Sequence, residues 1–214
     1  SYDSNDLDMI QNYQYKRTVS LNKEIKFGFV RGPVWNFGDE DMKHGIEEFV
    51  KNAQLDIEEL DLGKDFDDAA KAHEIIMNGS IANSLMNYYQ TDKSNLHPFT
   101  VKRIEAGIPV SASEYVTAIE QAKKMEQILK QFFLKYDAII TPAAPGQAPR
   151  DLMNTGNAIF NGYWTMMGVP AISLPFLKGK DDLPIGIQFI ANWSEDLKLL
   201  EICKYILEKE KLAN

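Results

Sequence analysis

In the first third of the chain, the hydrophobic positions change from a strand pattern to a helical pattern and back to a strand pattern. Residues 25–32, IKFGFVRG, are rich in aromatic and β-branched side chains, which favours a strand. Residues 39–53 place apolar side chains such as Met42 and Ile46 at helical spacing, and residues 55–62 return to a strand pattern. A strand, a helix and a strand in this order usually form a right-handed crossover between parallel strands, so the pattern predicts an α/β fold.

The middle of the chain has a helical pattern. Residues 67–90 predict one long helix or two shorter ones, because glycine at the Asn-Gly-Ser stretch 78–80 weakens a helix. Residues 96–110 predict a short helix that ends at Gly107. Ser111 and Glu114 have the spacing of a capping box, and an apolar stripe then continues to about residue 136.

The last third of the chain predicts strands between helices. Residues 137–141 favour a strand that stops at a loop with three prolines, and residues 157–168 favour a short buried helix. Residues 169–176 and 183–191 predict a hairpin of two strands, which implies a mixed sheet. A final helix is expected to begin near Ser194. Its inward positions are expected to be Leu200, Cys203, Ile206 and Leu207.

These elements predict one α/β domain. Residues 1–24 are interpreted as an N-terminal helix and connector, and residues 25–214 as a single domain with a mixed β-sheet flanked by helices on both faces. The strands of the hairpin are nearly apolar on both sides, which is typical of a sheet that helices cover on each face.

Composition narrows the classes of partner. The net charge of −8 excludes the basic footprint that nucleic acids and anionic membranes require, so neither is expected as a direct partner. No apolar run is long enough to span a membrane, and the first residues lack the order of a signal peptide. With one cysteine, Cys203, no internal disulfide is available, and a cytoplasmic location is expected.

The residues that carry reactions do not form a recognisable catalytic arrangement. The sequence has no nucleophile elbow, no phosphate-binding loop and no pair of cysteines or histidines with metal spacing. His44, His73 and His97 lie in polar contexts and are interpreted as solvated surface histidines. From the residues alone we therefore expect no catalytic residue, no metal ligand and no cofactor in this chain.

Four sequence blocks nevertheless resemble the amidase signature family, the Ser–Ser–Lys amide hydrolases that include aryl and fatty-amide hydrolases and one component of the tRNA-dependent glutamine amidotransferase. The blocks, in the family's order and spacing, are FTVKRIEAGIPVSASEYVTAIEQAKKMEQILKQFF, YDAIITPAAPGQAP, NTGNAIFNGYWTMMGVPAISLPF and LPIGIQFIANWSEDLKLLEICKYILE. The resemblance covers most of this chain but only the C-terminal half of the family's usual length.

The resemblance implies a role without the catalytic groups. In the family a lysine and a Gly/Ser-rich loop with two serines carry the reaction, and neither occurs here. We therefore expect the C-terminal portion of an amidase-family hydrolase acting on C–N amide bonds, which supplies scaffold and a wall of the substrate pocket. The alternative is a non-catalytic binding or assembly module derived from the same fold.

The resemblance also implies partners and a site. The expected partners are a small-molecule amide substrate in the full-length protein and the missing N-terminal catalytic half. A homodimer is a further alternative, because an uncovered apolar face favours association. The family's matching segments line the substrate cleft. The residues that this assigns to substrate binding are Thr141, Pro142, Asn157, Asn161, Trp164 and Thr165.

Overall fold

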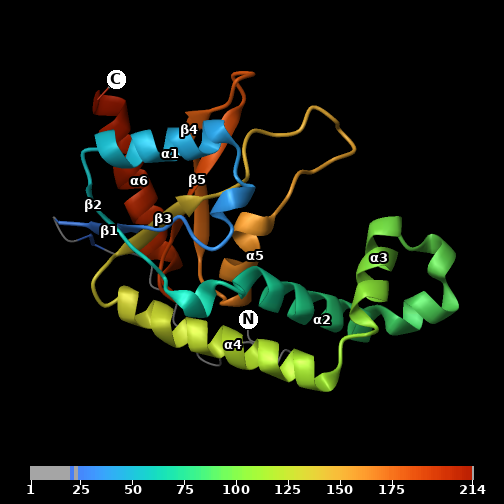
Figure 1. The fold of residues 1–214 in the computed structure, drawn as a ribbon. Helices are drawn as coiled ribbons and strands as arrows, with labels where there is room; N and C mark the ends of the chain where they lie inside the picture. Colours follow the sequence, from blue (N-terminus) through green and yellow to red (C-terminus); the bar gives the residue numbers. More distant parts are fainter. Residues whose placement is uncertain (1–19, 22–23, 214) are drawn as a thin grey trace.

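A five-stranded mixed sheet lies at the centre of the computed structural model, which describes residues 20–21 and 24–213 (Figure 1). The expected N-terminal helix of residues 1–24 therefore falls almost entirely outside the described residues. The strand order is β2-β1-β3-β5-β4, with β1 parallel to β2 and β3, and β5 antiparallel to β3 and β4. The strands are β1 (Lys26–Phe29), β2 (Asp56–Glu59), β3 (Ala138–Pro142), β4 (Ala171–Lys178) and β5 (Pro184–Ile190).

The described residues form six α-helices, none of which is long and apolar enough to cross a membrane. They are α1 (Glu40–Asn52), α2 (Ala69–Thr91), α3 (Pro98–Gly107), α4 (Ala112–Phe132), α5 (Ile159–Met166) and α6 (Asp196–Ala213). Helix α3 packs against α2 on an arm away from the sheet (Figure 1). The predicted β-α-β unit is confirmed, and so is the capping box, in which the Ser111 side chain accepts from the Glu114 amide while Glu114 accepts from the Ser111 amide.

Helices cover both faces of the sheet, as the sequence predicts. Helices α1 and α6 lie on one face, where the Phe49 ring of α1 stacks on Phe176 of β4 at 5.3 Å between centroids. Helices α2, α4 and α5 lie on the opposite face. Phe176 in turn meets Phe189 of β5 edge-on, so aromatic side chains connect α1 to the centre of the core.

The stretch that could divide α2 does not interrupt it, because its glycine faces a close helix crossing. A Cβ on Gly79 would lie 2.9 Å from the Tyr115 ring of α4, and one on Gly107 would lie 2.0 Å from the Asn78 carbonyl oxygen. The two glycines allow α2, α3 and α4 to approach one another. Glycine lowers the intrinsic stability of α2 at this point, but it does not break the helix, because its small size permits the close packing of the neighbouring helices.

The edge strand β4 departs from the expectation that helices cover both of its faces. Its side chains alternate, so that Leu174 and Leu177 are buried while Ala171, Ser173 and Pro175 are exposed. Pro175 lies within an irregularity of the pairing between β4 and β5. A proline and a bulge are the usual features of a sheet edge, where a missing donor breaks no ladder bond.

Helix α6 begins at Asp196, close to the expected start near Ser194, but its inward face differs from the expected one. Ser194 has a positive φ of 60° and precedes the helix. Cys203 and Ile206 are buried as expected, but Leu200 and Leu207 are exposed. The buried stripe instead uses Leu199 and Ile202, because these positions share the face of Cys203 and Ile206 at helical spacing.

Candidate functional site

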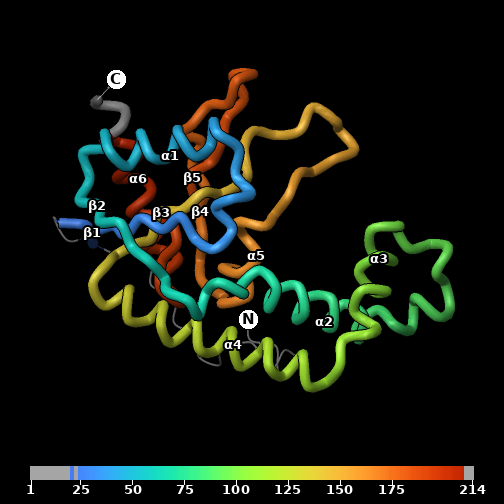
Figure 2. Tube along the Cα trace, viewed as in Figure 1, coloured from blue at the N-terminus to red at the C-terminus, as the bar shows by residue number. Residues whose placement is uncertain are grey.

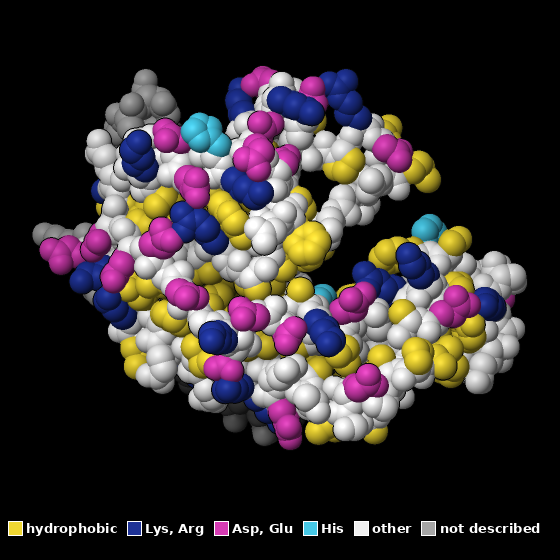
Figure 3. Space-filling model, viewed as in Figure 1, with side chains coloured by type: hydrophobic (Ala, Val, Ile, Leu, Met, Phe, Trp, Pro, Cys, Tyr) yellow, Lys and Arg dark blue, Asp and Glu magenta, His cyan; other side chains and the backbone are white. Residues whose placement is uncertain are grey.

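The proline-rich segment after β3 forms one wall of a hollow at the carboxyl end of that strand. The chain leaves the sheet there, makes a long excursion through residues 143–158 and returns into α5 (Figure 2). In the space-filling view this loop and the α2–α3 arm project from the same side of the molecule, with an open gap between them (Figure 3). We call the hollow beneath the loop the rim pocket.

The rim pocket has a volume of about 740 Å³. Its lining consists of residues 143–149 and 154–158 of the loop, Asn161 of α5, and Ser173, Pro184 and Gly186 of the β4–β5 hairpin. Ligands of open α/β sheets bind beyond the carboxyl ends of the strands, and this pocket lies at that position for β3. It is therefore the candidate functional site.

Three hydrogen bonds fix the inner end of the loop. The Ala143 amide donates to the Gly186 carbonyl at 3.1 Å, and the Asp39 amide donates to the Pro145 carbonyl at 2.7 Å. The Asn161 side chain donates through Nδ2 to the Ala143 carbonyl at 3.0 Å. The loop is thus attached to β5, to the start of α1 and to α5 at once.

A second set of bonds holds the loop from outside. Arg150 and Gln147 donate to the two carboxylate oxygens of Asp181 at 2.5 Å each, and the Asp181 amide donates back to Gln147 Oε1 at 3.2 Å. The hydrogen bonds from Arg150 and Gln147 lower the pKa of Asp181 below its usual value. The turn of the hairpin therefore acts as an anchor for the rim at neutral pH.

Glycines keep the floor and rim close to their neighbours. A Cβ on Gly186 would lie 2.2 Å from Ser173 Oγ, and one on Gly146 would lie 1.8 Å from an Asp39 carboxylate oxygen. A larger residue at either position would have to displace these side-chain oxygens. Both glycines therefore serve close packing rather than an unusual backbone angle.

The structure brings two of the six expected binding residues into the rim pocket. Asn157 and Asn161 line it, although Asn157 precedes α5 and its Oδ1 accepts from the Ile159 amide. Thr141 and Pro142 are buried at the end of β3, directly before the lining residues.

The other two expected residues lie away from the rim pocket. Trp164 is 1% exposed and packs on Tyr163 in the core, with 4.8 Å between ring centroids. Thr165 is exposed and lines a different hollow between α2, α4 and α5. Helix α5 starts at Ile159, so one helical face does not join Asn157 to Trp164.

A polar cluster lies buried between β3 and α5. Thr141 Oγ1 and Trp164 Nε1 lie near the Tyr163 hydroxyl, and none of these three buried atoms has a hydrogen bond of standard geometry within the described residues. Burial raises the pKa of Tyr163 well above its usual value, so its hydroxyl stays protonated. A Cβ on Gly32, whose φ is +75°, would lie 2.6 Å from that hydroxyl, which makes this position inaccessible to a larger residue.

Gln188 is a buried polar residue of this region that the sequence did not point out as part of the site. It is 3% exposed, and its Nε2 donates to the carbonyls of Pro142 and Phe160 at 3.0 Å each. It therefore joins the end of β3 to α5 beneath the rim pocket. A glutamine inside the apolar strand LPIGIQFIA is the signal that points to such a buried bond.

In the described part of the chain, no hydrogen bond joins a serine hydroxyl to a lysine. There the serine hydroxyls that make side-chain hydrogen bonds contact Tyr115 and Glu114 rather than a lysine. Burial raises the pKa of Cys203 to about 12, so its thiol is not a thiolate at neutral pH. Among residues 24–213, no group of three acidic, histidine or cysteine side chains could hold a metal ion.

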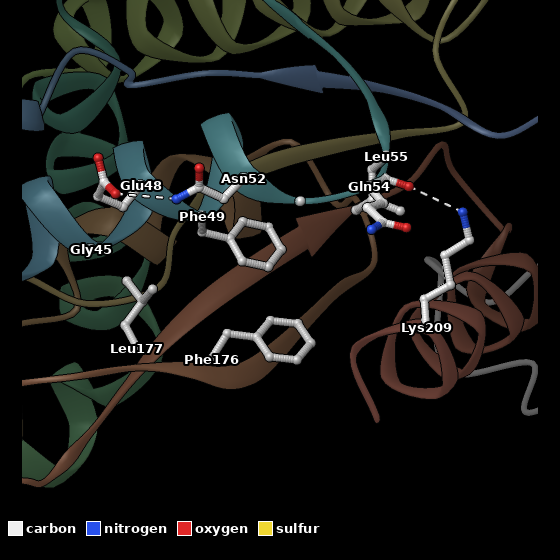
Figure 4. Close-up of a pocket in the computed structure, with 10 residues that line it drawn as sticks. Gly45, Glu48, Phe49, Asn52, Gln54, Leu55, Phe176, Leu177 and Lys209 are labelled. Carbon is white, nitrogen blue, oxygen red and sulfur yellow. Dashed lines mark hydrogen bonds between the residues drawn. The ribbon is translucent and has the colours of Figure 1, made fainter. Parts of the chain in front are cut away.

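A second hollow of about 520 Å³ lies on the other side of the sheet, between α1, β4 and α6 (Figure 4). Phe49 and Phe176 form its apolar base, and Lys209 donates to the Gln54 carbonyl at its end. The Asn52 amide is already bonded to Glu48. Because its polar groups are used within the protein, this hollow is a weaker candidate than the rim pocket.

His73 is not the solvated surface residue that the sequence predicts. It is half-buried between α2 and α5, where a Cβ on Gly162 would lie 2.6 Å from its Nδ1. Burial is the main cause that lowers the pKa of His73, Arg103 lowers it further, and Glu74 partly opposes both.

The lowered pKa of His73 predicts a pH dependence of stability. Protonation of His73 opposes folding. Its neutral form therefore contributes fully to the free energy of unfolding above the unfolded pKa of about 6.5, and this contribution is lost as the pH falls below that value. Urea unfolding at pH 7.5, 6.5 and 5.5 measures this slope. His73→Gln should flatten it, whereas the exposed His44→Gln should leave it unchanged; equal slopes in all three proteins would contradict the assignment.

Comparison with known proteins places the chain in one family. The family model described as Amidase matches residues 1–200. A glutamyl-tRNA(Gln) amidotransferase subunit of Agathobacter rectalis is 26% identical over 249 aligned positions, which cover 99% of this chain and 49% of the relative. The corresponding protein of Aliarcobacter butzleri is 34% identical over 125 positions, covering 53% of this chain and 28% of the relative.

Solved structures share the fold. A crystal structure of an amidase superposes with a TM-score of 0.75 at 16% identity, covering 86% of this chain and 45% of its own. A 6-aminohexanoate cyclic dimer hydrolase complexed with substrate gives 0.69 at 17% identity, covering 89% and 46%. The chain thus spans about half the length, or less, of these relatives.

Proposed function

This chain belongs to the amidase family, and from that premise we propose that it is the C-terminal portion of a hydrolase acting on amide C–N bonds. Its role in that enzyme is to supply the scaffold and one wall of the substrate pocket. The proposal places the catalytic serines and lysine outside this sequence, in a region that corresponds to the part of the relatives that the chain does not cover.

The rim pocket is the observation that carries this proposal. It lies at the carboxyl end of β3, its loop is anchored to three separate elements, and Asn157 and Asn161 offer amide groups along one side. The pocket has polar groups that can orient a ligand, but nothing in it attacks a carbonyl carbon. A wall without a nucleophile fits a chain that completes the active site of a larger enzyme.

Asn161 provides the test of this site. In the complete gene product that contains this chain, Asn161→Ala should weaken substrate binding by about 1–2 kcal/mol, because one hydrogen bond to the substrate is lost. KM should therefore rise about fivefold to thirtyfold while kcat changes less. Steady-state kinetics on an aryl amide measures both constants.

The control for this variant separates binding from support of the loop. Asn161→Ala also removes the bond to the Ala143 carbonyl, which alone is expected to reduce stability by about 1 kcal/mol. Arg150→Ala loosens the same loop from outside, where the residue lines no part of the pocket. If both variants change KM equally, or if Asn161→Ala changes only the unfolding midpoint, Asn161 is structural and the pocket assignment is wrong.

A further inference from the structure

We propose that the rim pocket selects an uncharged, amide-bearing part of the substrate and rejects a carboxylate at the same position. This inference rests on the proposed function, because it names the class of substrate for that site. It follows from three properties of the pocket: the charge of its lining, the orientation of its amide side chains, and the charges directly behind it.

The lining contains no charged residue. Its loop segments 143–149 and 154–158 consist of small, proline and amide residues with one threonine, and the hairpin adds Ser173, Pro184 and Gly186. The nearest cation along the loop is Arg150, whose guanidinium is bound to Asp181. A ligand in the pocket therefore meets dipoles and apolar surface but no formal charge.

The asparagine side chains of the pocket are oriented by bonds whose direction is fixed. Asn161 must present Nδ2 to the Ala143 carbonyl, because a carbonyl can only accept, and this leaves its Oδ1 as an acceptor for a ligand. Asn157 and Asn154 accept amide protons from Ile159 and Gly156 through Oδ1, which leaves their Nδ2 groups as donors.

This set of groups matches an amide better than a carboxylate. A carboxamide both donates and accepts, so it can bond to Asn161 Oδ1 and to the two Nδ2 groups. An ionised carboxylate only accepts, so its oxygen would face Asn161 Oδ1 without a proton between them. One potential hydrogen bond would become a repulsive contact.

The charges just behind the lining also disfavour an anion. A carboxylate oxygen of Asp39 lies directly behind Gly146, close enough that a Cβ there would be 1.8 Å from it. Asp181 lies beyond Gln147, and its charge is balanced by Arg150 and Lys180. An anion without a paired cation is costly to desolvate, and the Asp39 carboxylate, which caps α1 through the Met42 amide, adds like-charge repulsion.

The test uses two substrates that differ in one group. Succinamic acid 4-nitroanilide ends in a carboxamide, and the mono-4-nitroanilide of succinic acid ends in a carboxylate of nearly equal size. With the complete gene product, kcat/KM for the carboxamide should exceed that for the carboxylate by about tenfold or more. Equal rates, or a preference for the carboxylate, would overturn the inference.

A charge placed in the pocket should shift this preference. Thr155 lines the pocket and is exposed, so Thr155→Lys should favour the carboxylate by about fivefold relative to the parent enzyme. Leu152 lies three positions earlier in the same loop, is 98% exposed and does not line the pocket. Leu152→Lys is the matched control and should leave the ratio unchanged; equal shifts in both variants would contradict a role of the pocket.

Failure of the proposed function would look different. If the complete gene product hydrolyses neither anilide nor any other amide, the hydrolase proposal fails, and binding of the same pair by calorimetry still decides the inference. Tighter binding of the carboxamide, reversed in Thr155→Lys, would support it. Equal binding, tighter binding of the carboxylate, or no binding of either compound would overturn it.

Discussion

The 214-residue chain by itself should hydrolyse simple aryl amides no faster than buffer. A serine hydrolase that lacks its nucleophile and base is slowed by a factor on the order of 10⁶, and the rim pocket contains neither group. Ser173, the serine in the lining, lies at an exposed sheet edge, and the described residues place no lysine in hydrogen-bond contact with it. Release of 4-nitroaniline, followed for hours at high protein concentration, measures the rate.

The matched comparison is the complete gene product. A fluorophosphonate that labels active serines should modify the complete protein once, outside residues 1–214, and should leave the isolated chain unlabelled. Turnover by the purified chain, or a labelled serine within it, would contradict the prediction. A gene that encodes only this chain, together with no turnover, would instead favour the binding or assembly module.

The Gln188→Leu substitution should lower the free energy of unfolding by about 2–4 kcal/mol. The side chain is nearly isosteric and removes no apolar packing, but the buried Pro142 carbonyl loses its donor, and the Phe160 carbonyl keeps only its bond within α5. A lost hydrogen bond costs about 1 kcal/mol, and a buried acceptor without a partner costs about 1–3 kcal/mol. Urea unfolding followed by tryptophan fluorescence measures the change, because Trp164 and α5 lie next to the lost bonds.

A control on the same scale is available in α4. Gln127 is exposed there, and Gln127→Leu should change the unfolding free energy by less than about 0.5 kcal/mol. In the complete enzyme Gln188→Leu should also raise KM, because the end of β3 and α5 would no longer be held together beneath the rim pocket. A stable Gln188→Leu variant would show that these carbonyls find other partners.

Local signals predicted most of the elements. The capping box at Ser111, the end of α3 at Gly107 and the β4–β5 hairpin all depend on residues close in sequence, and the structure confirms each. Apolar periodicity and β-branched content were sufficient for these features, because their stabilising contacts lie within the same segment.

The features that the sequence did not predict depend on contacts between distant residues. Gly79 continues a helix because Tyr115 of α4 packs against it, and the sequence near Gly79 carries no sign of that contact. The rim is anchored by Asp181, 31 positions after Arg150. The resemblance to the family places Trp164 in the pocket wall, and the structure packs it against Tyr163 in the core, a contact that a resemblance of segments does not reveal.

The order of the strands has a consequence for how the chain folds. Strands β4 and β5 are joined by a tight turn, so they can pair early and without a large loss of chain entropy. The central pairing of β1 with β3 instead joins residues as far apart as Lys26 and Asp137, 111 positions along the chain. We expect α2, α3 and α4 to form before that pairing closes, and the closure of the sheet to limit the folding rate.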